Sequence, residues 1–324
     1  MPCPILNYYF HRIRYIMKSI ALTGATSMLG LALIRQCILN DIKVIAFVRP
    51  DSSRLNRLPG SDFLKIVGCN LDDLADFEST EKKIGSVDVF YHFGWSHTDK
   101  RGRPDCDKQL ENLHYTLAAV RLAKRMGCRK FIGVGSQAEY GRSLVPLTSA
   151  TPVNPENAYG ISKYAAGKFA KVECEKLGLD YVWVRVLSVY GSNDNDNTLI
   201  KDFIFNCKEN RTMPLSPCTH VWDFLYEDDA GKAFLAIGKK GINGKVYCLG
   251  SGNGRPLKEF LEIIKNMVNP KYVPQYAEIP YNDNYVKYLC ADISELSRDT
   301  WWEPETSFEE GVKIICSPFP ITGI

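Results

Sequence analysis

Short strand-like runs alternate with helix-like runs along the first 190 residues of the chain. The strand-like runs lie at 18–22, 42–49, 63–71, 87–94, 130–136 and 180–191. Apolar residues at helical spacing mark helix-like runs at 29–39, 107–126 and 159–177. Because strands that alternate with helices form βαβ units, the pattern predicts a parallel sheet. Right-handed crossovers make that sheet doubly wound, so the predicted fold class is α/β of the Rossmann type.

The pattern changes after Gly191. A polar loop at 192–197 and a loop-rich stretch at 208–220 follow, and then a strand-like run at 246–252 and a helix-like run at 255–268. We therefore predict two structural units and an extension. These are a Rossmann domain of residues 17–191 plus about 221–250, a smaller C-terminal substrate lobe of about 192–220 plus 251–320, and an extension at 1–16.

Composition argues against several classes of partner. The 324 residues carry a net charge of only +3 without a dense run of Lys and Arg, so charge gives no reason to expect nucleic acid. No apolar stretch approaches the roughly 20 residues of a membrane span, and the first stretch lacks the apolar centre of a secretory signal. The eleven cysteines are scattered without metal-ligand spacing. We expect a cytoplasmic protein with reduced thiols, no metal and no membrane association.

The segment IALTGATSMLG, from Ile20 to Gly30, joins the first strand to the first helix. A strand, a glycine turn and a helix N-terminus bring free N–H groups and the positive end of a helix dipole to one point, which suits a pyrophosphate. Gly24 would allow the turn, and Gly30 would let the helix pack on the sheet. Ser27 stands where the backbone should approach the phosphates most closely, in place of a middle glycine. Its side chain must therefore point away from the phosphates or bond to them.

The end of the second strand indicates which dinucleotide is bound. The strand ends at Arg49 in FVRPDSSR, with Ser52, Ser53 and Arg54 close behind. An acid at this end would bind the 2′-hydroxyl of NAD, whereas a guanidinium and hydroxyls suit the 2′-phosphate of NADP. We expect NADP(H) rather than NAD(H), with Asp51 as the alternative acid for NAD.

The motif YGISK places Tyr159 and Lys163 four residues apart, on one face of a helix. A tyrosine has an ordinary pKa of about 10, too high for ready proton exchange at neutral pH. An adjacent ammonium favours the phenolate and lowers that barrier. Ser136, in VGSQAEYG at the end of the fifth strand-like run, can hydrogen-bond a substrate carbonyl and the Tyr159 hydroxyl. Together the three side chains predict an acid–base site.

These residues together resemble the extended short-chain dehydrogenase/reductase family of sugar-nucleotide epimerases, dehydratases and reductases. The resemblance covers about 18–315 and rests on the order of TGATSMLG, CNLDD, VFYHFGW, Asn112, GSQAEYG, YGISK, VRVLSVYG, VWDFLYEDDAGKAF and WWEPETSFEEG. It implies that Tyr159 is the acid/base, that Lys163 also binds the nicotinamide ribose, and that Ser136 assists. The residues expected at the cofactor are Gly24, Thr26, Ser27, Met28, Leu29, Arg49, Ser52, Arg54, Asn70, Leu71, Phe93, Gly94, Trp95, Asn112, Tyr159 and Lys163.

Departures from the family's pattern narrow the function. Family 4,6-dehydratases follow the catalytic hydroxyl with an Asp–Glu pair, where this chain has Gln137 and an alanine, so dehydration is not expected. Ser188 stands where many UDP-sugar members have an Asn, and Trp222 where many have an Arg near the diphosphate. We expect Gln137, Ser188 and Trp222 to contact the substrate, with a solvated Gln and a core Trp as the alternatives. Asn70 replaces an Asp that often faces the adenine, and its carbonyl can accept the same hydrogen bond.

Three functions follow from the resemblance. The first is an NADP(H)-dependent reductase of a nucleotide-linked 4-keto-6-deoxy sugar, because an enzyme that consumes hydride usually takes NADPH. SQAEYG with WDFLY also resembles bacterial reductases of such sugars. The second is an NAD(P)-dependent nucleotide-sugar 4-epimerase with the same three residues and a retained cofactor. The third is a non-catalytic NADP-binding protein. The resemblance also implies a homodimer paired through the helices near 107–126 and 159–177.

Overall fold

The computed structural model describes residues 17–77, 86–281 and 285–317, and the predicted extension at 1–16 lies outside them. Within the described residues, seven parallel strands form one sheet in the order β3-β2-β1-β4-β5-β6-β10. The chain winds outward from β1 to β3 and then returns to β4 beside β1, which confirms the predicted doubly wound fold. The strands are β1 (Ser19–Thr23), β2 (Lys43–Val48), β3 (Leu64–Gly68), β4 (Val89–His92), β5 (Lys130–Ser136), β6 (Asp180–Val186) and β10 (Val246–Leu249).

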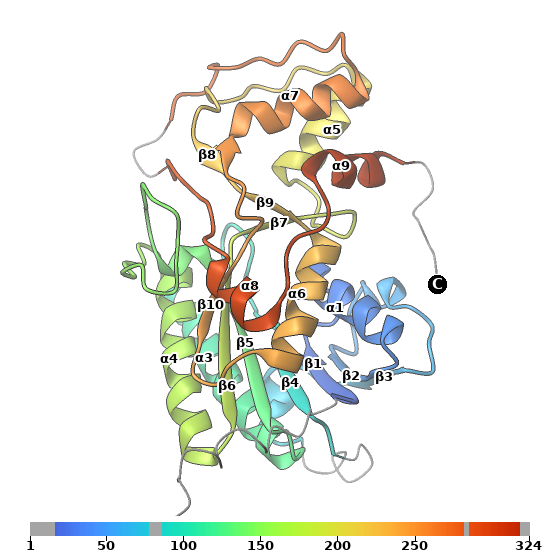
Figure 1. Cartoon of the computed structure of the whole chain (residues 1–324), viewed down its shortest axis with the longest axis vertical. Helices are drawn as coiled ribbons and strands as arrows, with labels where there is room; N and C mark the ends of the chain where they lie inside the picture. The colour runs from blue at the N-terminus through green and yellow to red at the C-terminus, as the bar shows by residue number, and fades with distance from the viewer. Residues whose placement is uncertain (1–16, 78–85, 282–284, 318–324) are drawn as a thin grey trace, which may run out of the picture.

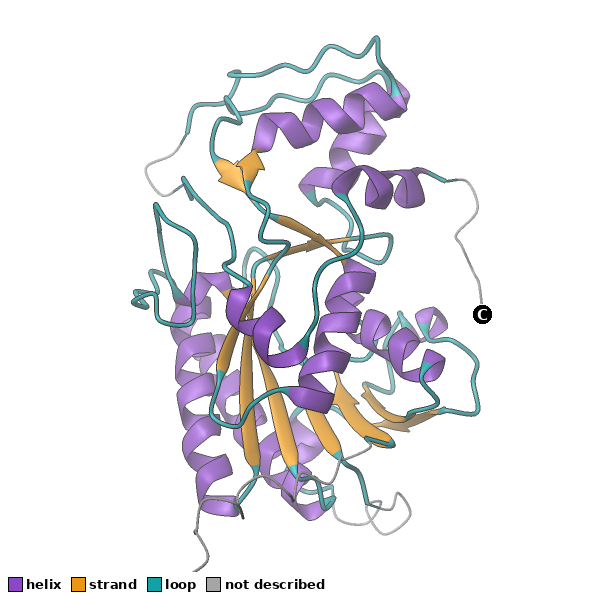
Figure 2. Cartoon of the chain, viewed as in Figure 1, coloured by secondary structure: helices purple, strands orange, loops and turns teal. Residues whose placement is uncertain are grey.

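Helices cover both faces of this sheet (Figures 1 and 2). One face carries α1 (Met28–Leu39), α6 (Glu227–Lys240) and α8 (Ser294–Thr300), and the other carries α3 (Cys106–Arg125) and α4 (Ala158–Leu177). Because alternate residues of a strand face opposite sides, Ile20 and Leu22 pack with α1 and α6 while Ala21 packs with α3 and α4. The predicted helices at 29–39, 107–126 and 159–177 lie within one residue of these bounds.

The predicted strand at 180–191 is wrong in one respect, because it is two strands in two sheets. β6 ends at Val186, and the Leu187 N–H donates to Leu249 O at the end of β10. The chain then leaves the large sheet as β7 (Ser188–Tyr190), which pairs in parallel with β9 (Phe224–Tyr226). Tyr190 packs on Phe308 in the second lobe, with ring centroids 5.0 Å apart. A continuous run of strand-forming residues cannot reveal such a change of partner.

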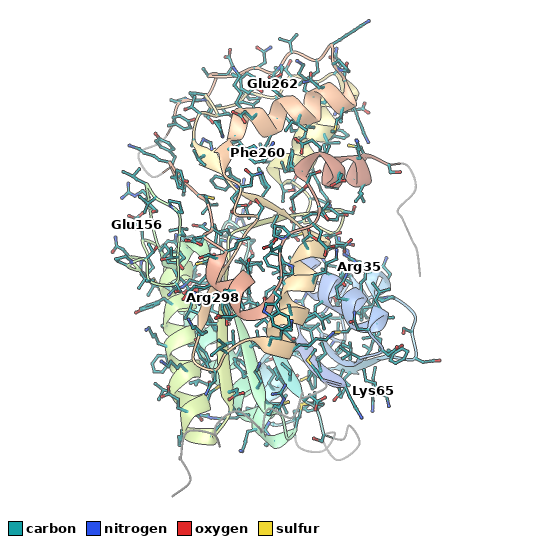
Figure 3. All side chains as sticks on the ribbon, viewed as in Figure 1. Arg35, Lys65, Glu156, Phe260, Glu262 and Arg298 are labelled. Carbon is teal, nitrogen blue, oxygen red and sulfur yellow. The ribbon has the colours of Figure 1, made fainter. Side chains whose placement is uncertain are left out.

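The second lobe lies beyond the β7–β9 pair, at the top of Figure 1. It contains α5 (Leu199–Glu209), α7 (Leu257–Val268), α9 (Phe308–Cys316) and the antiparallel pair β8 (Val221–Trp222) and β11 (Arg255–Pro256). Phe260, which Figure 3 shows on α7, packs edge-on against Phe308 with centroids 4.6 Å apart. The predicted helix at 255–268 begins only at Leu257, because Arg255 and Pro256 pair with β8 instead.

The segment around α8 connects the two lobes. Leu296 and Trp302 fall in the range predicted for the substrate lobe, yet both pack in the core between the sheet and helices α1 and α6. The remaining domain boundaries stay a prediction. No helix in the described part of the chain is both long and apolar enough to cross a membrane.

Candidate functional site

A cavity of about 1150 Å³ opens along the carboxyl ends of the parallel strands. Its walls come from the segments that follow β1 to β6, on both sides of the point where the strand order reverses. Open α/β sheets bind their ligands at this edge, and the volume exceeds the roughly 300–1,000 Å³ of a typical small-molecule site. The predicted site residues that line it are Gly24, Thr26, Ser27, Met28, Leu29, Arg49, Ser52, Arg54, Leu71, Phe93, Gly94, Trp95, Ser136, Gln137, Tyr159 and Lys163.

The glycine loop after β1 forms one end of the cavity. Gly24 has a φ of +72°, and a Cβ there would lie 2.7 Å from Gly94 N, so both its conformation and its closeness to the β4 end require glycine. Ser27 is the N-cap of α1: its hydroxyl donates to Gly24 O at 2.7 Å and accepts from Gly30 N at 3.1 Å. A Cβ at Gly30 would collide with Gly24 O, so the close approach that requires glycine here is that of α1 to the glycine loop rather than to the sheet.

The predicted acid–base residues meet at the opposite wall. Asn157 caps α4 by accepting from Gly160 N at 2.8 Å, which places Tyr159 and Lys163 in the first turns of the helix. Ser136, at the end of β5, hydrogen-bonds the Tyr159 side chain. Lys163 Nζ donates to the backbone oxygen of Val134 at 2.7 Å and lies 5.9 Å from the Tyr159 ring centroid.

Burial dominates the electrostatics of this group. It raises the pKa of Tyr159 above its usual range, although the Arg103 guanidinium and the Ser136 hydrogen bond oppose it. Burial also lowers the pKa of Lys163 to about 7, against the attraction of Glu139. The expectation that the Lys163 ammonium makes Tyr159 ionise readily is therefore not met in the protein alone. The Lys163 nitrogen hydrogen-bonds the backbone of β5, and burial disfavours its charged form.

Glu139 fixes the position of Ser136. Its buried carboxylate accepts from Ser136 N at 3.0 Å, from the Trp183 indole N–H at 3.0 Å and from Arg185 Nε at 2.7 Å. The Ser136 hydroxyl in turn accepts from the N–H of Ala138 at 3.2 Å. The end of β5 is thereby tied to β6, and Glu139 itself does not line the cavity.

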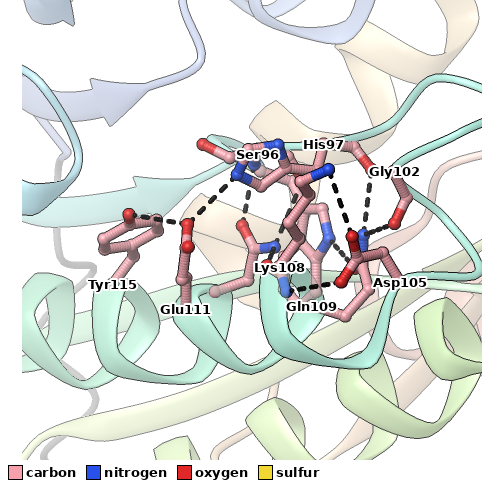
Figure 4. A network of polar contacts seen from close by, with 10 residues as sticks. Ser96, His97, Gly102, Asp105, Lys108, Gln109, Glu111 and Tyr115 are labelled. Atoms are coloured by element: carbon pink, nitrogen blue, oxygen red, sulfur yellow. Dashed lines mark hydrogen bonds and ion pairs between the residues drawn. The ribbon is translucent and has the colours of Figure 1, made fainter.

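The loop between β4 and α3 is held by two buried amides, as Figure 4 shows in part. Gln109 accepts from the Trp95 indole N–H at 2.9 Å and donates to His97 O and Gly102 O at 2.9 and 3.1 Å. Asn112 accepts from Ser96 N at 2.7 Å. The indole of Trp95 then lies under the Lys163 ammonium, 3.7 Å from nitrogen to ring centroid. Asn112 thus supports the cavity wall from behind and is not among its lining residues.

Comparison with known proteins identifies the family. The model of the NAD dependent epimerase/dehydratase family matches residues 20–250, most of the chain. The protein belongs to this family. It is therefore an enzyme of the extended short-chain dehydrogenase/reductase type that modifies nucleotide sugars, and the glycine loop, the α1 N-terminus and the acid–base wall fit an NAD(P) cofactor.

Curated relatives of this epimerase/dehydratase family member span several reactions. CDP-abequose synthase of Salmonella muenchen is 26% identical over 315 residues, which cover 93% of this chain and 98% of the relative. A trifunctional UDP-glucose 4,6-dehydratase/UDP-4-keto-6-deoxy-D-glucose 3,5-epimerase/UDP-4-keto-L-rhamnose-reductase of Arabidopsis thaliana is 26% identical, with 92% of this chain and 46% of that protein covered.

Solved structures show the same fold at lower identity. UDP-glucose 4-epimerase of Thermotoga maritima, with UDP-glucose, has a TM-score of 0.80 at 20% identity, with 92% of this chain and 97% of that chain covered. The dTDP-glucose 4,6-dehydratase of Bacillus anthracis, in complex with NAD, has a TM-score of 0.78 at 21% identity, with 91% and 94% covered.

Three other predicted ligand residues do not line the cavity either. The side chain of Asn70 donates to Asp73 at 2.8 Å. Ser188 and Trp222 contact each other, because the Trp222 indole N–H donates to Ser188 Oγ at 3.0 Å. The structure thus brings the last two together between β7 and β8, and their contact with a substrate stays a prediction.

Sequence reasoning missed two parts of the wall. Arg103, in the β4–α3 loop, lines the cavity with its guanidinium carbon 4.9 Å from the Tyr159 ring centroid. The polar loop at 192–197 contributes Asn193 to Asn195, and Arg57 donates to Asn193 O at 3.3 Å. The first segment follows β4 of the large sheet, and the second follows β7, which continues the chain from β6. The rule that ligands bind at strand carboxyl ends would have found them.

The capping geometry predicts the effect of changes at Ser27. Ser27→Gly should leave the affinity for the NAD(P) cofactor within about tenfold, or roughly 1.4 kcal/mol, because the hydroxyl forms its hydrogen bonds with the loop and with α1. Ser27→Ala should instead lower the free energy of unfolding by about 1 kcal/mol through loss of the N-cap. Fluorescence titration with NADPH and urea unfolding measure the two effects. Complete loss of NADPH binding in Ser27→Gly would show that the hydroxyl is an essential phosphate ligand.

Proposed function

We propose that the protein is an NADP(H)-dependent reductase of a nucleotide-linked 4-keto-6-deoxy sugar. The observation that carries the proposal is the composition of the cavity wall. It includes Ser136, Tyr159 and Lys163 from β5 and α4, and Arg49 and Arg54 from the segment that follows β2. Neither arginine forms an ion pair or hydrogen bond through its side chain with another described residue. Two available cations near the end of β2 suit a 2′-phosphate.

Each residue of the acid–base wall has a separate role in the proposed reduction. NADPH supplies a hydride to the carbonyl carbon when it is bound. Tyr159 donates its proton to the carbonyl oxygen as that oxygen gains charge, and Ser136 orients the same oxygen by a hydrogen bond. Lys163 binds the nicotinamide ribose. Its lowered pKa also lets it exchange protons with its surroundings near neutral pH.

Dehydration is disfavoured by the residues that follow Ser136. Gln137 and Ala138 line the cavity, and neither side chain can serve as a general acid or base. The next carboxylate, Glu139, is bound to Arg185, Trp183 and the backbone of Ser136, outside the cavity lining. An elimination would need a free acid at this position, so reduction without elimination agrees better with the wall.

The second candidate is a nucleotide-sugar 4-epimerase that uses the same three residues. Its support is the epimerase and NAD-bound structures that share the fold. An epimerase returns the hydride to the sugar and retains its cofactor, whereas a reductase consumes NADPH with each turnover. Stoichiometric oxidation of NADPH by a nucleotide-linked 4-keto-6-deoxy sugar supports the reductase. Interconversion of two sugars without net oxidation supports the epimerase.

The cofactor preference can be tested at the end of β2. The double variant Arg49→Ala/Arg54→Ala should raise the KM for NADPH by roughly tenfold or more, about 1.4 kcal/mol, because the 2′-phosphate loses its cations. The KM for NADH should change little. As the matched variant for the opposite reading, Asp51→Ala should leave both constants unchanged. If Asp51→Ala instead raises the KM for NADH alone, and the double variant leaves the KM for NADPH unchanged, the protein is an NAD enzyme.

We also propose a homodimer that pairs through α3 and α4. Large apolar side chains are exposed on the outer surfaces of these helices: Leu110 on α3, and Ile161, Phe169 and Val172 on α4. The three on α4 share one side of the helix, since their spacing of eight and three residues is close to whole turns. An apolar stripe of this kind is typical of a protein interface.

The stripe predicts the effect of a charge on association. Phe169→Glu should convert the dimer to a monomer in sedimentation at micromolar protein, because the carboxylate would be buried without a partner. Phe205→Glu on α5 is the matched control, since the two phenylalanines are exposed to 52% and 51%. A native protein that sediments as a monomer, or a Phe169→Glu variant that remains dimeric, would contradict this pairing.

A further inference from the structure

Arg103 places a permanent positive charge on the face of Tyr159. Its guanidinium carbon lies 4.9 Å from the Tyr159 ring centroid, at the cavity wall. The arginine side chain forms no ion pair or hydrogen bond with other described residues. A guanidinium remains protonated at every pH at which a protein is folded. The Arg103 charge therefore acts on the ring at every such pH, and no ion pair with another described residue neutralises that charge.

Several hydrogen bonds hold the backbone of the loop that carries the exposed side chain of Arg103. Asp99 accepts from Arg101 N and Gly102 N at 2.7 and 2.9 Å, which closes a turn just before Arg103. The buried Gln109 holds the same turn through its bond to Gly102 O at 3.1 Å (Figure 4). Asp105, two residues after Arg103, caps α3 by accepting from Lys108 N. The backbone on both sides of Arg103 is thus fixed before any ligand binds.

The other charges that face Tyr159 cannot replace Arg103. Burial, and to a smaller extent Arg103 itself, lowers the pKa of Lys163 on the same helix to about 7, so Lys163 is only partly charged at neutral pH. Glu139, after β5, disfavours the phenolate, and its own charge is paired with Arg185 of β6. Ser136 offers a hydrogen bond without a charge. Arg103 is the group from the β4–α3 loop whose charge favours the phenolate of Tyr159.

We propose that Arg103 is a positioning residue for proton transfer: it holds the Tyr159 ring by stacking and stabilises the Tyr159 phenolate. The inference rests on the proposed acid–base role of Tyr159, and not on the choice between reductase and epimerase. In reduction, bound NADPH would supply the hydride and become NADP⁺, and the Tyr159 O–H bond breaks as its proton passes to the sugar oxygen. The phenolate that remains is stabilised by Arg103 until solvent returns the proton.

Nitration of tyrosine by tetranitromethane tests this inference without a substrate, because the reagent attacks the phenolate. In the full-length protein, Arg103→Gln removes the charge and opens the ring face. Loss of charge predicts slower nitration of Tyr159, whereas loss of a merely structural cover predicts faster nitration. Peptide mass spectrometry at a fixed pH gives the rate at Tyr159 relative to Tyr164, which is on the same helix and serves as the internal reference.

We expect the relative rate at Tyr159 to fall severalfold in Arg103→Gln, because loss of the guanidinium charge lowers the fraction of Tyr159 that is phenolate. Arg103→Lys should restore most of the rate, and Arg101→Ala, in the same loop but outside the cavity lining, should leave it unchanged. An equal or faster rate in Arg103→Gln would overturn the inference. Because the readout needs no turnover, it separates failure of this inference from failure of the proposed reductase activity.

Discussion

The arrangement of the site depends on the buried ion pair between Glu139 and Arg185. The two charges meet at 2.7 Å, where both side chains are almost fully buried, and they join the segment after β5 to β6. The same carboxylate accepts from Ser136 N, so the pair also sets the position of the hydroxyl that meets Tyr159. Removal of one member of a buried pair typically costs about 3–5 kcal/mol, since the remaining charge has no partner. The acid–base wall is thus coupled to the stability of the sheet.

The elements that depend on local pattern were predictable from the sequence. Strand and helix periods predicted the parallel sheet and its helices, and right-handed crossovers predicted that the sheet is doubly wound. The spacing of Tyr159 and Lys163 and the position of Ser136 gave a group that the structure does assemble at one wall. The glycine loop was also recognised. The role of its Ser27 as a helix cap was not, because capping depends on the loop conformation.

The features that depend on tertiary contacts were missed or misplaced. Leu187 gave no sign that the chain changes sheets there. The sequence did not reveal that the Asn112 amide holds Ser96 behind the wall, and the contact of Asn112 with the cofactor stays a prediction. The pKa of Tyr159 was expected to fall beside Lys163, whereas burial raises it and Arg103 opposes the rise. Burial and the contacts of one loop with a distant helix decide these properties, and neither has a local sequence signature.

The most direct test of the central claim is turnover by Tyr159→Phe. The measurement is the rate of NADPH oxidation by nucleotide-linked 4-keto-6-deoxy sugars, together with NADPH binding to the same preparation. The change removes the proton donor and keeps the ring, so binding should be retained while the rate falls by about 10²–10⁴-fold, the usual contribution of a general acid. A Tyr159→Phe variant that reduces these sugars at the native rate would contradict the proposed role of the acid–base wall.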